Sequence, residues 1–264
     1  MNCGPMTERS GDFTEDAFLG GQLRLRQPTF GHRAGHDAIL LAAATSAQPG
    51  DRVVDFGAGV GAAGLAVAKR VAGIDIILVE IDPGLAEFAR GNAVSNGLQA
   101  KVVVLDIASG AEPFMAAGLP PDSADVVLMN PPFNDPARHR SSPDKARDIA
   151  HVAKATTLES WIHAARRVLK SGGALTLIWR ADALAEILAA LDRGFGSLAI
   201  LPVHGDAASP AIRVLVRAVK GGRAPATLYP GLMLNSASEN APCVPDRKVQ
   251  DILAGREILP LAAL

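Results

Sequence analysis

The sequence is poor in cysteine and in aromatic residues, and it carries no strong charge of either sign. Its 264 residues include two cysteines, two tryptophans and one tyrosine, and the formal net charge is −1. Cys3 and Cys243 are far apart and lack CxxC spacing, which argues against a disulfide framework and a cysteine zinc site. Since the net charge gives no global basic field, a nucleic acid would have to be held by local basic clusters.

Long apolar runs are also missing. No stretch of about 18 consecutive apolar residues occurs, and the acidic N-terminal segment has no apolar core of the kind found in a signal peptide. Hydrophobic residues nevertheless make up 48% of the chain, enough to bury one large core. We therefore expect a cytoplasmic protein with no membrane contact and no metal.

Short apolar runs alternate with segments of helical pattern along most of the chain. The apolar runs are rich in β-branched residues, as in strands covered on both faces: "RVVDF", "IDIILVE", "KVVVLD", "ADVVLMN" and "GALTLIW". Segments that can bury one helical face lie between them, at residues 61–71, 83–95 and 156–170. This alternation predicts an α/β fold with a doubly wound, mostly parallel sheet.

The sheet is expected to close with an antiparallel pair. The runs "GSLAILPVH" and "AIRVLVRAV" are separated by "GDAASP", a short turn that suits a C-terminal hairpin. The predicted architecture is thus a seven-stranded Rossmann-like sheet over residues 50–264. Residues 1–49 are predicted to form an N-terminal extension, a hairpin and a leading helix, packed on this domain.

A glycine-rich loop follows the first predicted strand, in "VVDFGAGVGAAG". Its letters fit the dinucleotide pattern G-x-G-x-x-G at Gly59, Gly61 and Gly64. They also fit D-x-G-x-G-x-G, typical of S-adenosylmethionine sites, at Asp55, Gly57, Gly59 and Gly61. In both readings the glycines let the backbone approach the ligand, and the following helix N-terminus favours an anionic group.

Glu80 ends the second predicted strand, at the edge of the sheet where ligands bind. A carboxylate there can accept hydrogen bonds from ribose hydroxyls, which both kinds of cofactor carry. The glycine loop and Glu80 therefore leave the choice of cofactor open.

The end of the fourth predicted strand, "ADVVLMNPPFND", favours methyl transfer. The Asn130 side chain and the Pro131 carbonyl offer two acceptors, which can bind both hydrogens of an NH2 group. The nitrogen lone pair is then left facing a methyl donor. Pro132 extends the segment, and Phe133 offers a flat face for stacking.

These segments together carry a family resemblance. "DFGAGVG", "VEIDP", "ARGNAVSNGL" and "NPPF" resemble the class I S-adenosylmethionine-dependent N-methyltransferases. "GHRAGHDAILLAAA" and "IRVLVRAVKGGRAPATLYPGLMLN" are further similar to bacterial tRNA adenine-N6-methyltransferases, which act beside the anticodon of a valine tRNA.

The resemblance implies roles for individual residues. The glycine loop and Asp55 would surround the methionine part of the cofactor, Glu80 its ribose and Asp106 its adenine amino group. His36 and Asp37 would line the methionine end. The segment from Asn130 to Phe133 would hold the substrate.

Two basic segments suit a tRNA substrate. Residues 135–154 hold five basic side chains and three acids, and "RVLVRAVKGGR" adds Arg213, Arg217, Lys220 and Arg223. We therefore expect methylation of the exocyclic amino group of an adenine, in a tRNA anticodon loop. The alternatives are methylation of a protein glutamine amide, as in release-factor methyltransferases, and a nicotinamide-dependent oxidoreductase.

Overall fold

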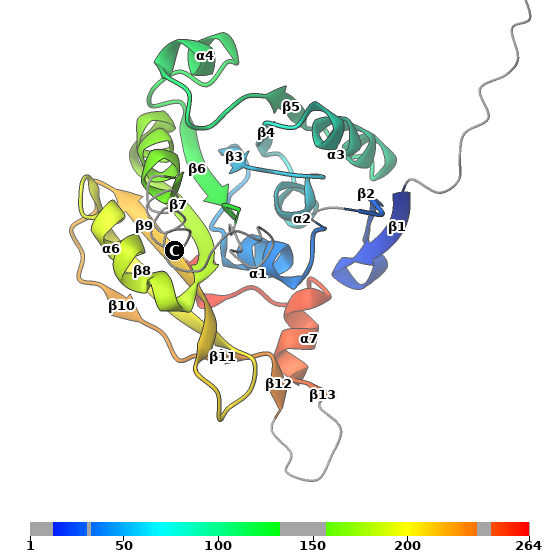
Figure 1. The fold of residues 1–264 in the computed structure, drawn as a ribbon, viewed down its shortest axis with the longest axis vertical. Helices are drawn as coiled ribbons and strands as arrows, with labels where there is room; N and C mark the ends of the chain where they lie inside the picture. Colours follow the sequence, from blue (N-terminus) through cyan, green and yellow to red (C-terminus); the bar gives the residue numbers. More distant parts are fainter. Residues whose placement is uncertain (1–12, 31–32, 133–156, 237–243, 264) are drawn as a thin grey trace, which may run out of the picture.

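One large sheet organises the chain (Figure 1). The structure is a computed structural model, and it describes residues 13–30, 33–132, 157–236 and 244–263. The sheet has nine strands in the order β10-β8-β9-β7-β6-β3-β4-β5, with β11 also paired to β8.

Five parallel strands form the centre and one edge of this sheet. They are β3 (Arg52–Phe56), β4 (Asp75–Glu80), β5 (Lys101–Val104), β6 (Ala124–Met129) and β7 (Leu169–Arg180). The strand β9 (Ala211–Lys220) is antiparallel to β7 and to β8 (Phe195–His204). The predicted doubly wound sheet with a C-terminal antiparallel hairpin is confirmed.

Two short strands extend the sheet beyond the seven that the sequence predicts. β10 (Thr227–Leu228) and β11 (Leu232–Met233) each pair with β8 in parallel, two residues at a time. They occupy backbone groups along the outer edge of β8, which β9 leaves free. Runs of two residues carry no alternation that a sequence pattern can detect.

Helices cover both faces of the sheet. One face carries α1 (His36–Ala44), α2 (Ala62–Arg70), α3 (Pro83–Ser95) and α7 (Arg247–Leu253). The other carries α4 (Ala111–Ala116), a helical segment over residues 157–168, and α6 (Leu184–Leu191), which follows the short η3 (Ala181–Ala183). Neighbouring residues of a strand point to opposite faces, so Val53 joins the first core and Val54 the second.

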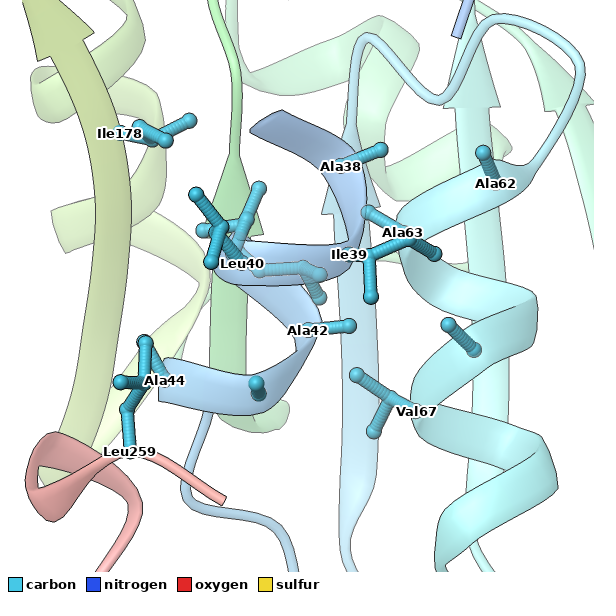
Figure 2. Close-up of a cluster of buried hydrophobic side chains, with 14 of the residues drawn as sticks. Ala38, Ile39, Leu40, Ala42, Ala44, Ala62, Ala63, Val67, Ile178 and Leu259 are labelled. Atoms are coloured by element: carbon cyan, nitrogen blue, oxygen red, sulfur yellow. The ribbon is translucent and has the colours of Figure 1, made fainter. Parts of the chain in front are cut away.

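The helix α1 belongs to the first of these cores (Figure 2). All residues from Ala38 to Ala44 are buried, and Figure 2 shows Leu40 beside Ile178 of β7 and Ile39 beside Ala63 of α2. The small side chains of both helices let their backbones approach closely. The structure thus places a helix of the N-terminal segment against the sheet, while the division at residue 49 stays a prediction.

A hairpin precedes α1. Its strands are β1 (Phe13–Phe18) and β2 (Leu23–Pro28), joined through the 3₁₀ turn η1 (Leu19–Gly21), and β2 lies beside α3 (Figure 1). Near the C-terminus a second small hairpin joins β12 (Asn235–Ser236) to β13 (Val244–Pro245), and η4 (Pro260–Ala262) ends the described chain. In the described part of the chain, the helices are too short or too polar to cross a membrane.

Candidate active site

The strands β3, β4 and β6 end side by side, and their following residues meet at one edge of the sheet. Phe56 at the end of β3 pairs with Val79 of β4 and with Met129 of β6. The residues that come next are therefore neighbours: the glycine loop after β3, Glu80 at the end of β4, and Asn130 after β6.

The loop glycines have different reasons to be glycine. Gly57, Gly59 and Gly61 all have positive φ angles, of 71°, 57° and 89°. A Cβ on Gly57 would lie 2.5 Å from the ring of Trp161, whereas a Cβ on Gly59 would meet nothing within 4 Å. Gly57 thus serves internal packing, while Gly59 keeps an open backbone surface that a ligand can approach.

Asp55 stabilises the loop by binding the start of the helix that follows it. It is 2% exposed, and its Oδ2 accepts a hydrogen bond of 2.8 Å from the N–H of Gly64, in the first turn of α2. Burial raises the pKa of Asp55 to about 7; the Gly64 hydrogen bond opposes this shift and the nearby Glu80 carboxylate adds to it. Its contact to the helix supports a role in shaping the loop, and direct contact with a cofactor stays a prediction.

Glu80 connects the ends of two strands. Its Oε2 accepts from the N–H of Gly59 at 2.7 Å and its Oε1 from the N–H of Asp82 at 2.9 Å. The residue is 7% exposed. A carboxylate has about four acceptor positions, so two remain for ligand hydroxyls.

The side-chain oxygen of Asn130 is buried. Its Oδ1 is shielded from solvent and accepts no hydrogen bond from the residues that the structure describes. Such a group is costly to leave unsatisfied and points to a missing donor. Pro131 is buried and Pro132 exposed, while the predicted stacking residue Phe133 lies outside the described residues.

Three further predicted residues lie around this edge. Asp106 follows β5 and is exposed, and its Oδ1 accepts from the N–H of Ala108 at 2.8 Å. His36 begins α1 and is exposed. Asp37 is half-buried and forms an ion pair with Arg213, with 2.9 Å between Oδ2 and Nε.

The basic residues predicted at 213–223 lie along β9, so their side chains do not form one cluster. Arg213 pairs with Arg180 just beyond the carboxyl end of β6, close to the site. Arg217 donates to the carbonyls of Leu261 and Ala263, and Lys220 bonds Asp122 and the Leu169 carbonyl. Arg217 thus binds the C-terminal segment, and Lys220 binds residues at the end of the sheet opposite the site. The other basic segment, residues 135–154, lies outside the described residues.

One residue that touches the loop has no role predicted from the sequence. Asn92 on α3 is 1% exposed and donates to the carbonyl of Val60 at 3.0 Å. The signal that could have found it is a polar amide on the apolar face of the helix, between Ala89 and Ala93.

Comparison with known proteins agrees with this geometry. Residues 33–204 match the family model of the methyltransferase small domain. A tRNA1(Val) (adenine(37)-N6)-methyltransferase of Porphyromonas gingivalis is 30% identical over 178 residues, 65% of this chain and 68% of the relative. Ribosomal RNA small subunit methyltransferase C of Pseudomonas syringae is 29% identical over 153 residues, 56% of this chain and 38% of the relative.

A solved structure is similar over most of the chain. The crystal structure of a predicted O-methyltransferase from Agrobacterium tumefaciens has a TM-score of 0.69 and 33% identity, and the match covers 84% of this chain and 98% of that one.

The doubly wound sheet and the glycine loop, together with these matches, define an S-adenosylmethionine-dependent methyltransferase. More particularly, the chain belongs to the methyltransferase small domain family. The prediction of a methyltransferase with this methyl donor is confirmed, in preference to a nicotinamide-dependent oxidoreductase.

Proposed function

We propose that this methyltransferase acts on the N6 amino group of an adenine in RNA, in a tRNA anticodon loop. The observation that carries the proposal is the buried Oδ1 of Asn130 at the carboxyl end of β6, which has no hydrogen-bond partner among the described residues. An exocyclic amino group is a donor that would satisfy it.

The residues of the site fit S-adenosylmethionine. The loop presents an open backbone surface at Gly59, and Glu80 keeps free acceptor positions for ribose hydroxyls. When bound, S-adenosylmethionine supplies an electrophilic methyl group on sulfur. We propose that the glycine loop and Glu80 hold the cofactor. The residues Asp106, His36 and Asp37 would lie around it, as the resemblance implies.

The remaining work of the site is orientation. Asn130 Oδ1 and the Pro131 carbonyl would each accept one amino hydrogen, which holds the nitrogen lone pair toward the methyl group. The nitrogen held in this way would take the methyl group from the donor, which would leave as the neutral sulfide, and the nitrogen would then lose one proton to solvent. Since the proton leaves after the methyl transfer, no strong base has to act in the first step.

An unpaired adenine suits this site better than a base-paired one. A base must be taken out of its stack to reach the Asn130 oxygen, which costs a few kcal/mol and costs least in a single-stranded loop. The named relatives support RNA as the substrate class, since one set acts on tRNA and another on ribosomal RNA. The match covers 68% of the tRNA enzyme and 38% of the ribosomal RNA enzyme, and we therefore favour tRNA.

The proposal is tested by methyl transfer to defined RNAs. Purified protein is incubated with labelled S-adenosylmethionine and either unmodified valine tRNA, the same tRNA with the anticodon-loop adenine changed to guanine, or small-subunit ribosomal RNA. The product nucleoside is identified by mass spectrometry after digestion. The expected result is N6-methyladenosine in the unmodified tRNA alone.

Other products would contradict the proposal in distinguishable ways. Methylation of the ribosomal RNA alone would place the chain with its second set of relatives. A methyl group on a ribose oxygen would contradict the amino-nitrogen chemistry altogether. Transfer to a protein glutamine, assayed with a peptide substrate, would favour the release-factor alternative.

A further inference from the structure

Asn92 of α3 and Asn96, the C-cap residue that follows this helix, bind the outer edge of β2. Asn96 accepts from the N–H of Arg24 at 2.9 Å and donates to its carbonyl at 2.6 Å. Asn92, one helical turn earlier, accepts from the N–H of Arg26 at 2.8 Å and donates to its carbonyl at 3.0 Å. The two side-chain amides thus occupy backbone groups of β2 as a neighbouring strand would, while β1 lies on the other edge.

Only Asn92 also reaches the glycine loop. Its Nδ2 carries two hydrogens, and the second one is donated to the carbonyl of Val60 at 3.0 Å. Val60 is 4% exposed and stands between Gly59 and Gly61, two of the three loop glycines with left-handed backbone. One buried amide therefore ties the N-terminal hairpin to the middle of the loop.

We propose that Asn92 is a positioning residue for the methyl-donor loop and makes the docked N-terminal hairpin part of the cofactor-binding machinery. The inference rests on the proposed function, because it assigns S-adenosylmethionine to that loop. Without the Asn92 amide the Val60 carbonyl loses a buried donor, and the loop is free to adopt other backbone angles around its glycines. The bound loop conformation is then populated less often, and the apparent cofactor affinity falls accordingly.

The structure offers a matched control in Asn96. Asn92→Ala and Asn96→Ala each remove one pair of hydrogen bonds to β2, but only the first removes the bond to Val60. Cofactor binding to the full chain is measured by calorimetry with S-adenosylhomocysteine, well below the melting temperature of both variants. We expect Asn92→Ala to weaken binding roughly ten-fold and Asn96→Ala by less than about two-fold.

Two further measurements separate positioning from general destabilisation. In steady-state methyl transfer, Asn92→Ala should raise KM for S-adenosylmethionine and leave kcat at saturation close to the wild-type value. Hydrogen exchange of the peptide covering residues 57–64 should be faster in the free Asn92→Ala protein than in Asn96→Ala. If Asn92→Ala does not fold, the isosteric pair Asn92→Asp and Asn96→Asp replaces it, since aspartate keeps the acceptor and cannot donate.

Equal loss of affinity in the two variants, or wild-type affinity in Asn92→Ala, would overturn the inference. A wild-type protein that binds neither S-adenosylmethionine nor its demethylated product would instead overturn the proposed function. In that case the hydrogen exchange of residues 57–64 still tests whether Asn92 positions the loop, because that measurement needs no cofactor.

Discussion

The N–H of Gly59 donates a hydrogen bond of 2.7 Å to the Glu80 carboxylate, and this contact joins the loop after β3 to the end of β4. Under the proposed function, Glu80 would act on the nucleoside part of S-adenosylmethionine in two ways. It holds the loop at Gly59, whose backbone surface is open, and its remaining acceptor positions would bind ribose hydroxyl groups.

We expect Glu80→Ala to weaken S-adenosylmethionine binding by roughly ten-fold or more, because hydrogen bonds to a charged group are lost from a buried site. Calorimetry with the cofactor product measures the change. The control is Glu87→Ala on α3, an exposed carboxylate that pairs only with Arg90 among the described contacts. Wild-type affinity in Glu80→Ala would show that the ribose is held elsewhere.

The raised pKa of Asp55 predicts a pH-dependent stability. A carboxyl group that titrates at about 7 when folded and near 3.8 when unfolded binds more protons in the folded state over that interval. Stability from this group is complete below the unfolded value and is lost as the pH rises toward 7. Asp55→Asn keeps an acceptor for the Gly64 N–H and removes the titration.

Urea unfolding of the wild type and of Asp55→Asn between about pH 4 and pH 8 tests this effect. The free energy of unfolding of the wild type should fall relative to the variant as the pH rises through this range. A constant difference between the two proteins would mean that Asp55 is ionised throughout.

The fold was predictable because the sequence patterns that determine helices and strands involve residues close together in the chain. The helix α3 has the bounds that the pattern gives, Pro83–Ser95, since Asp82 caps its first turn and Gly97 takes a left-handed conformation just beyond its end. The strand β3 likewise coincides with the apolar run "RVVDF".

The partners of the site residues were less predictable, because they are distant in sequence. Asn92 binds Arg26 across 66 residues, and Arg213 binds Asp37 across 176. Residue type alone also misled: the basic segment after Arg213 reads as one phosphate-binding cluster. In an extended strand, however, Arg213 and Lys220 are separated by about 24 Å. They therefore lie at opposite ends of β9.

This separation gives a prediction for RNA binding. Arg213→Gln should weaken tRNA binding and reduce the salt dependence of the affinity by about one charge, because Arg213 lies at the edge that carries Asn130. Lys220→Gln should leave the salt dependence unchanged. Asp37→Asn is a second control, since it removes the ion-pair partner and keeps the arginine charge.

Binding is measured by fluorescence anisotropy with labelled tRNA over a range of salt concentrations. A loss of salt dependence in Lys220→Gln as large as in Arg213→Gln would contradict the assignment of the RNA to the Asn130 edge.

The last prediction concerns the chemical step, in which we propose that Asn130 holds the amino group. Asn130→Ala removes the buried Oδ1 and should lower kcat by about 10²- to 10³-fold, as when one preorganised polar group is lost from a transition state. The affinity for S-adenosylmethionine should stay close to that of the wild type, because the donor loop and Glu80 are unchanged. Asn130→Asp keeps an acceptor and should retain part of the activity. Single-turnover transfer of labelled methyl to unmodified tRNA separates the chemical step from product release, and full activity of Asn130→Ala in this assay would contradict the role of its side chain in holding the amino group.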